Sequence, residues 1–121
     1  MAGITMLQTA SIFLLLTALG GIIMTGVRFA RKVNPPSWIA MAHGFLAASG
    51  LTLLTYAALT DRAHGGALTG LLLLVAASIG GVTLNLGYHL SGKILPAWLL
   101  SLHIALASAG TLLVAWSAWA G

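Results

Sequence analysis

Residues 36–54, PSWIAMAHGFLAASGLTLL, form an apolar run that carries one histidine, and the chain repeats it sixty residues later as PAWLLSLHIALASAGTLLV, residues 96–114. The copies agree in register at a proline, a tryptophan, a histidine, an alanine and a glycine: Pro36/Pro96, Trp38/Trp98, His43/His103, Ala47/Ala107 and Gly50/Gly110. Chance supplies matching leucines far more readily than five such residues in register. The chain is therefore predicted to be a duplicated unit.

The composition is that of a membrane protein. Of the 121 residues, 60% are hydrophobic and 5% are charged, and the mean hydropathy is +1.05. Long apolar runs with so little charge are typical of membrane-spanning segments. Asp61 is the only acidic residue and the sequence has no cysteine. This argues against carboxylate-pair catalysis, hard-cation sites, disulfides and thiolate metal centres within this chain.

Polar connections divide the chain into four apolar stretches, each near the ~20 residues that cross a bilayer core. We expect helices over roughly these ranges: 5–30, 37–60, 67–91 and 96–119. Short connections make consecutive helices antiparallel neighbours. The predicted fold is all-α, a single membrane domain over residues 1–121. It is an antiparallel four-transmembrane-helix bundle built from two tandem helical hairpins, residues 1–60 and 61–121.

The basic residues predict how the bundle is oriented. Arg28, Arg31, Lys32 and Lys93 lie at the first and third connections, whereas Arg62 alone lies at the second. Because cytoplasmic loops are enriched in Lys and Arg, both basic connections are expected in the cytoplasm and both termini outside. We expect an integral membrane protein, most simply of a bacterial inner membrane, whose first apolar run is kept as a span rather than cleaved as a signal.

The paired histidines are the strongest functional signal. An ionisable side chain inside a membrane is costly and marks a functional site by default. In an up-down bundle the second and fourth helices are diagonal partners, so His43 and His103 are expected to face each other. The residues four and seven positions later share their helix face and are small: Ala47, Gly50, Ala107 and Gly110. This pattern predicts room for a flat macrocycle, haem above all, whose metal both histidines bind from opposite sides.

With this bundle and these histidines the chain resembles the small four-helix membrane b-type cytochromes of the cytochrome b561 kind. Members of that group hold haem b between transmembrane helices and pass electrons among quinones, ascorbate, superoxide or partner proteins. The resemblance implies one haem b, with a second left open, and an electron relay serving a quinone, a redox partner protein or a larger membrane complex. It implies an electron-transfer protein or oxidoreductase subunit rather than a stand-alone enzyme.

His89 breaks the internal symmetry, because the matching position in the first copy is Phe29. One interpretation places it at a haem propionate beside three candidate partners: Tyr88, Arg28 and Lys93. A second makes it a quinone site together with Asn85. A third lets it extend to the lipid headgroups, and a fourth makes it a replacement for one of the paired histidines.

Other interpretations of the pattern stay open. The paired histidines would also serve as polar contacts between helices, and the chain would then suit a structural or assembly subunit without its own cofactor. A transporter or channel is less favoured, because no helix break or fixed intramembrane charge is visible. Zinc is less favoured than haem, because it normally requires four ligands and only three histidines lie in the predicted spans. Two glycine pairs, Gly20-Gly21 and Gly80-Gly81, are expected to let helices approach closely within the bundle or in a homodimer.

Overall fold

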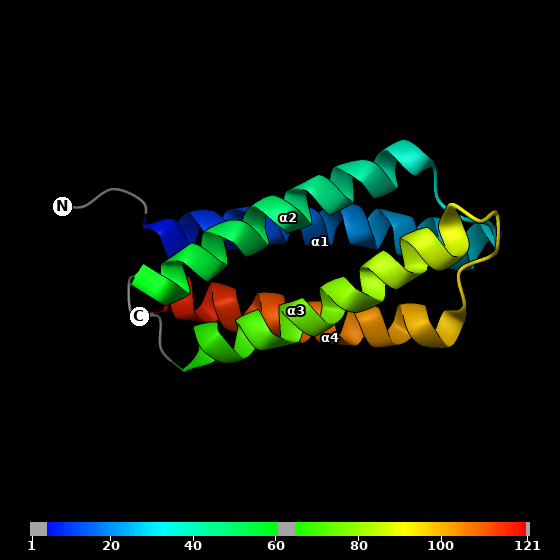
Figure 1. Ribbon diagram of the computed structural model, residues 1–121. Coiled ribbons are helices and arrows are strands. Elements are labelled where there is room, and N and C mark those ends of the chain that lie inside the picture. Colours follow the sequence, from blue (N-terminus) through cyan, green and yellow to red (C-terminus); the bar gives the residue numbers. More distant parts are fainter. Residues whose placement is uncertain (1–4, 61–64, 121) are drawn as a thin grey trace.

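A computed structural model describes residues 5–60 and 65–120 as helices arranged in two stacked hairpins (Figure 1). The helices are α1 Met6–Arg31, α2 Ser37–Thr60, α3 Gly66–Leu84 and α4 Ala97–Trp119, and α3 continues into a π-helical turn, η1, Asn85–His89. The predicted all-α four-helix bundle is confirmed. Asp61 and Arg62, which belong to the second connection, lie outside the described residues.

Local sequence sets where the helices begin and end. Thr5 and Gln8 form a capping box in which each side chain accepts a hydrogen bond from the other residue's backbone N–H. Lys32 adopts a left-handed conformation, with φ of 56°, and ends α1. Pro36 precedes α2 and Pro96 precedes α4, where a fixed φ and a missing N–H cost a helix nothing. The helices therefore begin and end close to the residues predicted from the sequence.

The two helices of each hairpin pack closely, whereas α2 and α3 share few contacts. Glycine allows this closeness. A methyl group added at Gly50 would stand 2.9 Å from Cδ2 of Leu14, and one added at Gly110 would stand 2.7 Å from Cγ of Leu74. Each hairpin is therefore a tight unit, and the seam between α2 and α3 is the most open part of the bundle.

Side-chain hydrogen bonds join α1 to α4 at the end of the bundle where the chain starts. The Gln8 amide donates to the carbonyl of Ala118 at 3.2 Å, and the Trp119 indole donates to the Ser11 hydroxyl at 2.8 Å. Ser11 is itself buried. Its hydroxyl also donates to the Gln8 carbonyl at 2.7 Å, so the bonds to Ala118 and from Trp119 are the ones that join the two hairpins at this end.

At the opposite end the two helix connections are tied together. The Asn34 amide nitrogen donates to the carbonyl of Lys93 at 2.7 Å, and its oxygen accepts from the backbone N–H of Leu95 at 3.0 Å. Nε of Arg28 donates to the Leu95 carbonyl at 2.9 Å. Hydrogen bonds therefore join the two hairpins at both ends of the bundle, through residues of α1 and of the connection that follows it.

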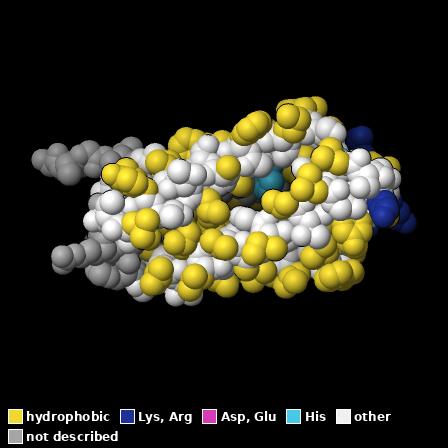
Figure 2. Space-filling model, in the orientation of Figure 1, with side chains coloured by type: hydrophobic (Ala, Val, Ile, Leu, Met, Phe, Trp, Pro, Cys, Tyr) yellow, Lys and Arg dark blue, Asp and Glu magenta, His cyan; other side chains and the backbone are white. Residues whose placement is uncertain are grey.

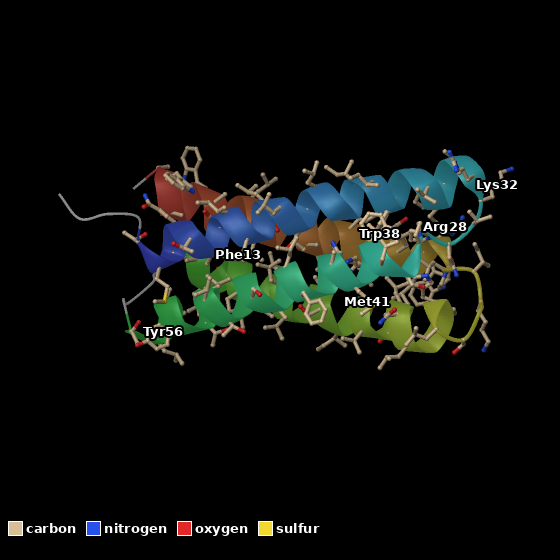
Figure 3. All side chains as sticks on the ribbon, turned by 90° about the horizontal axis from the view of Figure 1, so that it is seen from above. Phe13, Arg28, Lys32, Trp38, Met41 and Tyr56 are labelled. Carbon is tan, nitrogen blue, oxygen red and sulfur yellow. The ribbon has the colours of Figure 1, made fainter. Side chains whose placement is uncertain are left out.

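The outer surface suits a lipid environment. Each of the four long helices is long and apolar enough to span a membrane, and large apolar side chains cover the visible face (Figure 2). Lys and Arg side chains gather at one end of the bundle (Figure 2). Arg28 and Lys32 lie at this end, and Tyr56 lies at the other (Figure 3). The four tryptophans are exposed near helix ends, as expected at membrane interfaces. These are the features of an integral membrane protein.

Two apolar clusters fill the interior. One comprises Ala10, Leu14, Leu54, Leu74 and Val114, and the other comprises Leu84, Leu95 and Leu100. Along α3 the first cluster ends at Leu74 and the second begins at Leu84. The segment between them faces the histidines, so the polar layer of the bundle lies between two apolar layers.

Candidate functional site

The structure brings His43 of α2 and His103 of α4 together inside the bundle. Their ring centroids lie 6.4 Å apart and the ring planes cross at 68°. Both side chains are half-buried. The two residues are sixty positions apart in the sequence, so their proximity is a property of how the two hairpins stack.

A cavity of about 600 Å³ surrounds this pair and is lined by residues of all four long helices. This volume lies within the ~300–1,000 Å³ of small-molecule and cofactor pockets. The cavity opens between α2 and α3, where Figure 2 shows a hollow with a histidine side chain inside it. The opening faces the side of the bundle, where lipid would lie, rather than either end.

Each histidine is held by a backbone carbonyl of the other helix in its own hairpin. Nδ1 of His43 lies 2.9 Å from the oxygen of Thr17, and Nδ1 of His103 lies 2.7 Å from the oxygen of Ala77. A carbonyl oxygen only accepts, so Nδ1 must carry the hydrogen in both rings, which leaves the lone pair of a neutral ring on Nε2. Histidines that bind metals characteristically donate their other nitrogen in this way.

The glycine pairs make room for these rings. A methyl group at Gly21 would stand 3.2 Å from Cε1 of His43, and one at Gly81 would stand 3.1 Å from Cε1 of His103. The sequence predicted that these glycines allow close helix approach or dimer formation. In the structure they accommodate an imidazole from the neighbouring helix of the same hairpin.

The Nε2 atoms of His43 and His103 carry the lone pairs that are available for a ligand. Neither has a hydrogen-bond partner among residues 5–60 and 65–120, and no fully buried side-chain nitrogen or oxygen there lacks one. Each Nε2 must therefore face open space, which the cavity supplies. The two Nε2 atoms are thus the histidine atoms that a group in the cavity would meet.

The spacing of the rings suits a shared metal ion. A histidine nitrogen lies about 2.0 Å from its metal, and the ring centre lies about 1.15 Å farther on for ring bonds of about 1.35 Å. Two rings on opposite sides of one ion would have centres about 6.3 Å apart; the observed distance is 6.4 Å. Edge-to-face packing of two rings spans a similar range, so the distance fits both a shared ion and direct ring packing.

The small residues after each histidine divide into two kinds. Ala47 and Ala107 line the cavity, as the stripe predicted. Gly50 and Gly110 are buried outside it, against Leu14 and Leu74. Their place differs from the expectation that they clear space for a macrocycle, because the facing leucine of the hairpin already fills that space.

The π-helical turn η1 carries the second polar group of the cavity. Leu90 N–H donates to the Asn85 carbonyl at 2.8 Å, and Lys93 N–H donates to the Tyr88 carbonyl at 2.8 Å, both across five residues. Asn85 and His89 line the cavity. Neither side chain has a hydrogen-bond partner in the described part of the chain. No residue pattern in the sequence predicted this turn, although π turns often mark functional sites.

Two of the three proposed companions of His89, Tyr88 and Arg28, lie elsewhere. Tyr88 packs against the apolar cluster of Leu84, Leu95 and Leu100. Arg28 bonds the Leu95 carbonyl and lies 5.4 Å from the centre of the Phe29 ring. Neither residue lines the cavity. The interpretation that joins them to His89 at one propionate is thus not favoured by their positions.

A bare metal ion would find few ligands here. Among the described residues no three His, Cys, Asp or Glu side chains are grouped to hold one. A porphyrin supplies four nitrogens of its own and requires only axial ligands, which a histidine pair provides. No protein-family model, curated protein or solved structure matches the chain.

Proposed function

We propose that the protein is a membrane b-type cytochrome that holds one haem b between α2 and α4. His43 and His103 are the iron ligands. The observation that carries the proposal is the pair of imidazoles, each tied through Nδ1 to a carbonyl and each with a free Nε2 at a shared cavity. If the two histidines were unrelated polar contacts, they would not need the same carbonyl partner and the same neighbouring glycine in each hairpin. Nor would their ring centres need to lie at the distance that a shared metal ion requires.

Haem iron with two histidine ligands exchanges single electrons and has no open position for O₂. The chain's own residues set the conditions for that exchange. Ala47 and Ala107 leave the sides of the cavity free of bulky groups. The apolar lining, including Leu14, Leu74 and Leu100, would exclude water from the site. The protein is then an electron relay or an oxidoreductase subunit rather than a stand-alone enzyme.

The electron donor or acceptor is proposed to approach through the bilayer. The cavity opens between α2 and α3, and Asn85 and His89 offer hydrogen-bonding groups along its wall. A quinone is the membrane-soluble carrier that uses such groups. A redox partner protein, a larger membrane complex or a second copy of the chain would instead meet the outer surface.

The proposed orientation follows the cations. Arg28, Arg31, Lys32 and Lys93 belong to the end at which both basic connections lie. The positive-inside rule places that end in the cytoplasm of a bacterial inner membrane, with both termini outside. Reporter fusions at each connection would test the assignment, since a periplasmic signal from residues 32–36 contradicts it.

A spectrum tests the function. Protein purified from haem-sufficient cells should be red, with sharp reduced α and Soret bands and about one haem per chain by pyridine haemochrome assay. Colourless protein under those conditions would overturn the proposal. It would leave the histidines as polar contacts, in a structural or assembly subunit without its own cofactor.

A further inference from the structure

Each ligand histidine sits in what we call an imidazole slot. The first slot consists of Gly21 and the Thr17 carbonyl, and it holds His43. The second consists of Gly81 and the Ala77 carbonyl, and it holds His103. Glycine and carbonyl lie one helical turn apart on the same face of α1 or α3. The two slots are related by the sixty-residue repeat.

A slot restrains its ring in two ways. The Nδ1–carbonyl bond fixes where one edge of the ring points, at 2.9 Å for His43. The ring also lies close to α1 at Gly21, since a methyl group added there would approach Cε1 of His43 to 3.2 Å. Rotation of the ring about its Nε2 axis would break the bond or bring the ring into the helix backbone.

We infer that the two slots set the angle between the axial imidazole planes, and through it the electronic state of an iron ion held between them. The inference rests on the proposed haem site. The slots hold the rings of His43 and His103 with their planes crossed at 68°. Gly21 and Gly81 are positioning residues in this scheme, since they act on the iron only through the histidines.

The electronic consequence follows from orbital symmetry. An imidazole donates π density from the orbital perpendicular to its plane, so it raises one of two iron d orbitals that are otherwise equal in energy. Two parallel rings raise the same orbital and separate the pair, whereas crossed rings raise both. Crossed planes therefore leave the two orbitals nearly degenerate and retain orbital angular momentum. Axial ligation is among the means by which a protein tunes haem iron.

Electron paramagnetic resonance of the ferric protein tests this. Wild-type protein should show one dominant low-spin feature at a large g value instead of the three resolved lines of parallel imidazoles. Gly21→Ala and Gly81→Ala should each move the largest g value, because the added methyl group would meet Cε1 at 3.2 Å or 3.1 Å and turn the ring. A three-line wild-type spectrum, or spectra of both variants identical to wild type, would overturn the inference.

The neighbouring glycines supply matched controls. Methyl groups at Gly20 and Gly80 would lie 3.7 Å or more from the histidine atoms, an ordinary contact distance. Gly20→Ala and Gly80→Ala should therefore bind haem and keep the wild-type spectrum. They share the added helix propensity of the test variants. A shift in the controls equal to that of the test variants would reject a specific effect of Gly21 and Gly81.

A second measurement separates this inference from the proposed function. Nitrogen-15 NMR of haem-free protein reports which ring nitrogen carries the hydrogen, and both slot histidines should be in the Nδ1–H form. If the protein binds no haem yet shows this form, the proposed function fails and the slots stand. If haem binds but haem-free protein shows the Nε2–H form, the inference about the slots is overturned. It is also overturned if the variants fail to accumulate and the wild-type spectrum shows three lines.

Discussion

The first hairpin and the second agree around the histidine and differ at the connection that follows. Around His43 and His103 the glycine pair, the carbonyl partner and the ring contact are repeated at an offset of sixty residues. In both hairpins the carbonyl belongs to the residue twenty-six positions before the histidine. This matched geometry is what the proposed haem site requires, because each hairpin would supply one imidazole to it.

The ends of the hairpins have diverged. α1 remains α-helical through Phe29 and ends at Arg31, whereas the matching part of the second hairpin is the π turn with His89. Asn34 ties the two connections together, and the residue at its matching position is Ile94. The two hairpins are therefore alike where the histidines are held and different at the wall of the cavity near the cationic end.

The sharpest way to break this comparison is to remove one ligand. His43→Ala and His103→Ala should each abolish stoichiometric haem binding, because a single remaining imidazole leaves one axial position empty. The losses should be alike, and the dissociation constant for haem should rise by more than about tenfold if each ligand contributes more than about 1.4 kcal/mol of binding free energy. Haem-to-protein ratios of purified variants give the measurement. Retention of haem by one variant alone would show that the hairpins do not contribute equally.

A second way is to give the second hairpin a residue of the first. Gly70 occupies the position that Ala10 holds in the first hairpin. Gly70→Ala would place a methyl group 2.8 Å from the Gly110 carbonyl oxygen and 2.7 Å from Cγ2 of Val114. Such overpacking costs about 1–3 kcal/mol, so the thermal midpoint should fall. Gly26→Ala, which meets nothing within 4 Å, is the control, and an equal midpoint for both variants would contradict the tight α3–α4 crossing.

The fold was predictable because its signals are local. Prolines, basic clusters and run lengths set the helix boundaries, and the repeat indicated that His43 and His103 belong together. The partner of each Nδ1 was not predictable, since it is a backbone carbonyl that no side chain identifies. Gly21 was visible as half of a repeated pair, but its role depends on how α1 is rotated toward α2. That rotation is a property of packing.

The packing glycines and the π turn show the same limit. Gly50 shares a face with His43 in the helical pattern, yet it lies against Leu14 because the helices of the hairpin touch there. A π turn inserts one residue into a helical turn, which shifts the faces of the residues that follow it. Sequence spacing identifies which residues share a face, and only the neighbouring helix decides which of them line the cavity.

The tie between the connections gives a prediction of moderate size. Asn34→Ala removes two hydrogen bonds, to Lys93 and Leu95, that have no counterpart at Ile94. At about 0.5–1.5 kcal/mol for each bond, the variant should lose about 1–3 kcal/mol of stability in a detergent unfolding titration. Thr52→Ala is the control, because its hydroxyl bonds only a carbonyl of its own helix. Equal stability of the two variants would mean that the seam does not depend on this tie.

The smallest expected effect lies at His89, where the hairpins differ most in chemistry. His89→Ala should keep the haem and shift its midpoint potential by less than about 60 mV, the shift that corresponds to a tenfold change for one electron. His89 lines the cavity but is not one of the two proposed iron ligands, so it would act on the iron only through the electrostatic field of its ring. Phe29→Ala, the matched change in the first hairpin, should leave the potential unchanged because Phe29 does not line the cavity. Redox titration of both variants is the measurement. Loss of haem in His89→Ala would make His89 a ligand, and the equal contribution of the two hairpins would then be wrong.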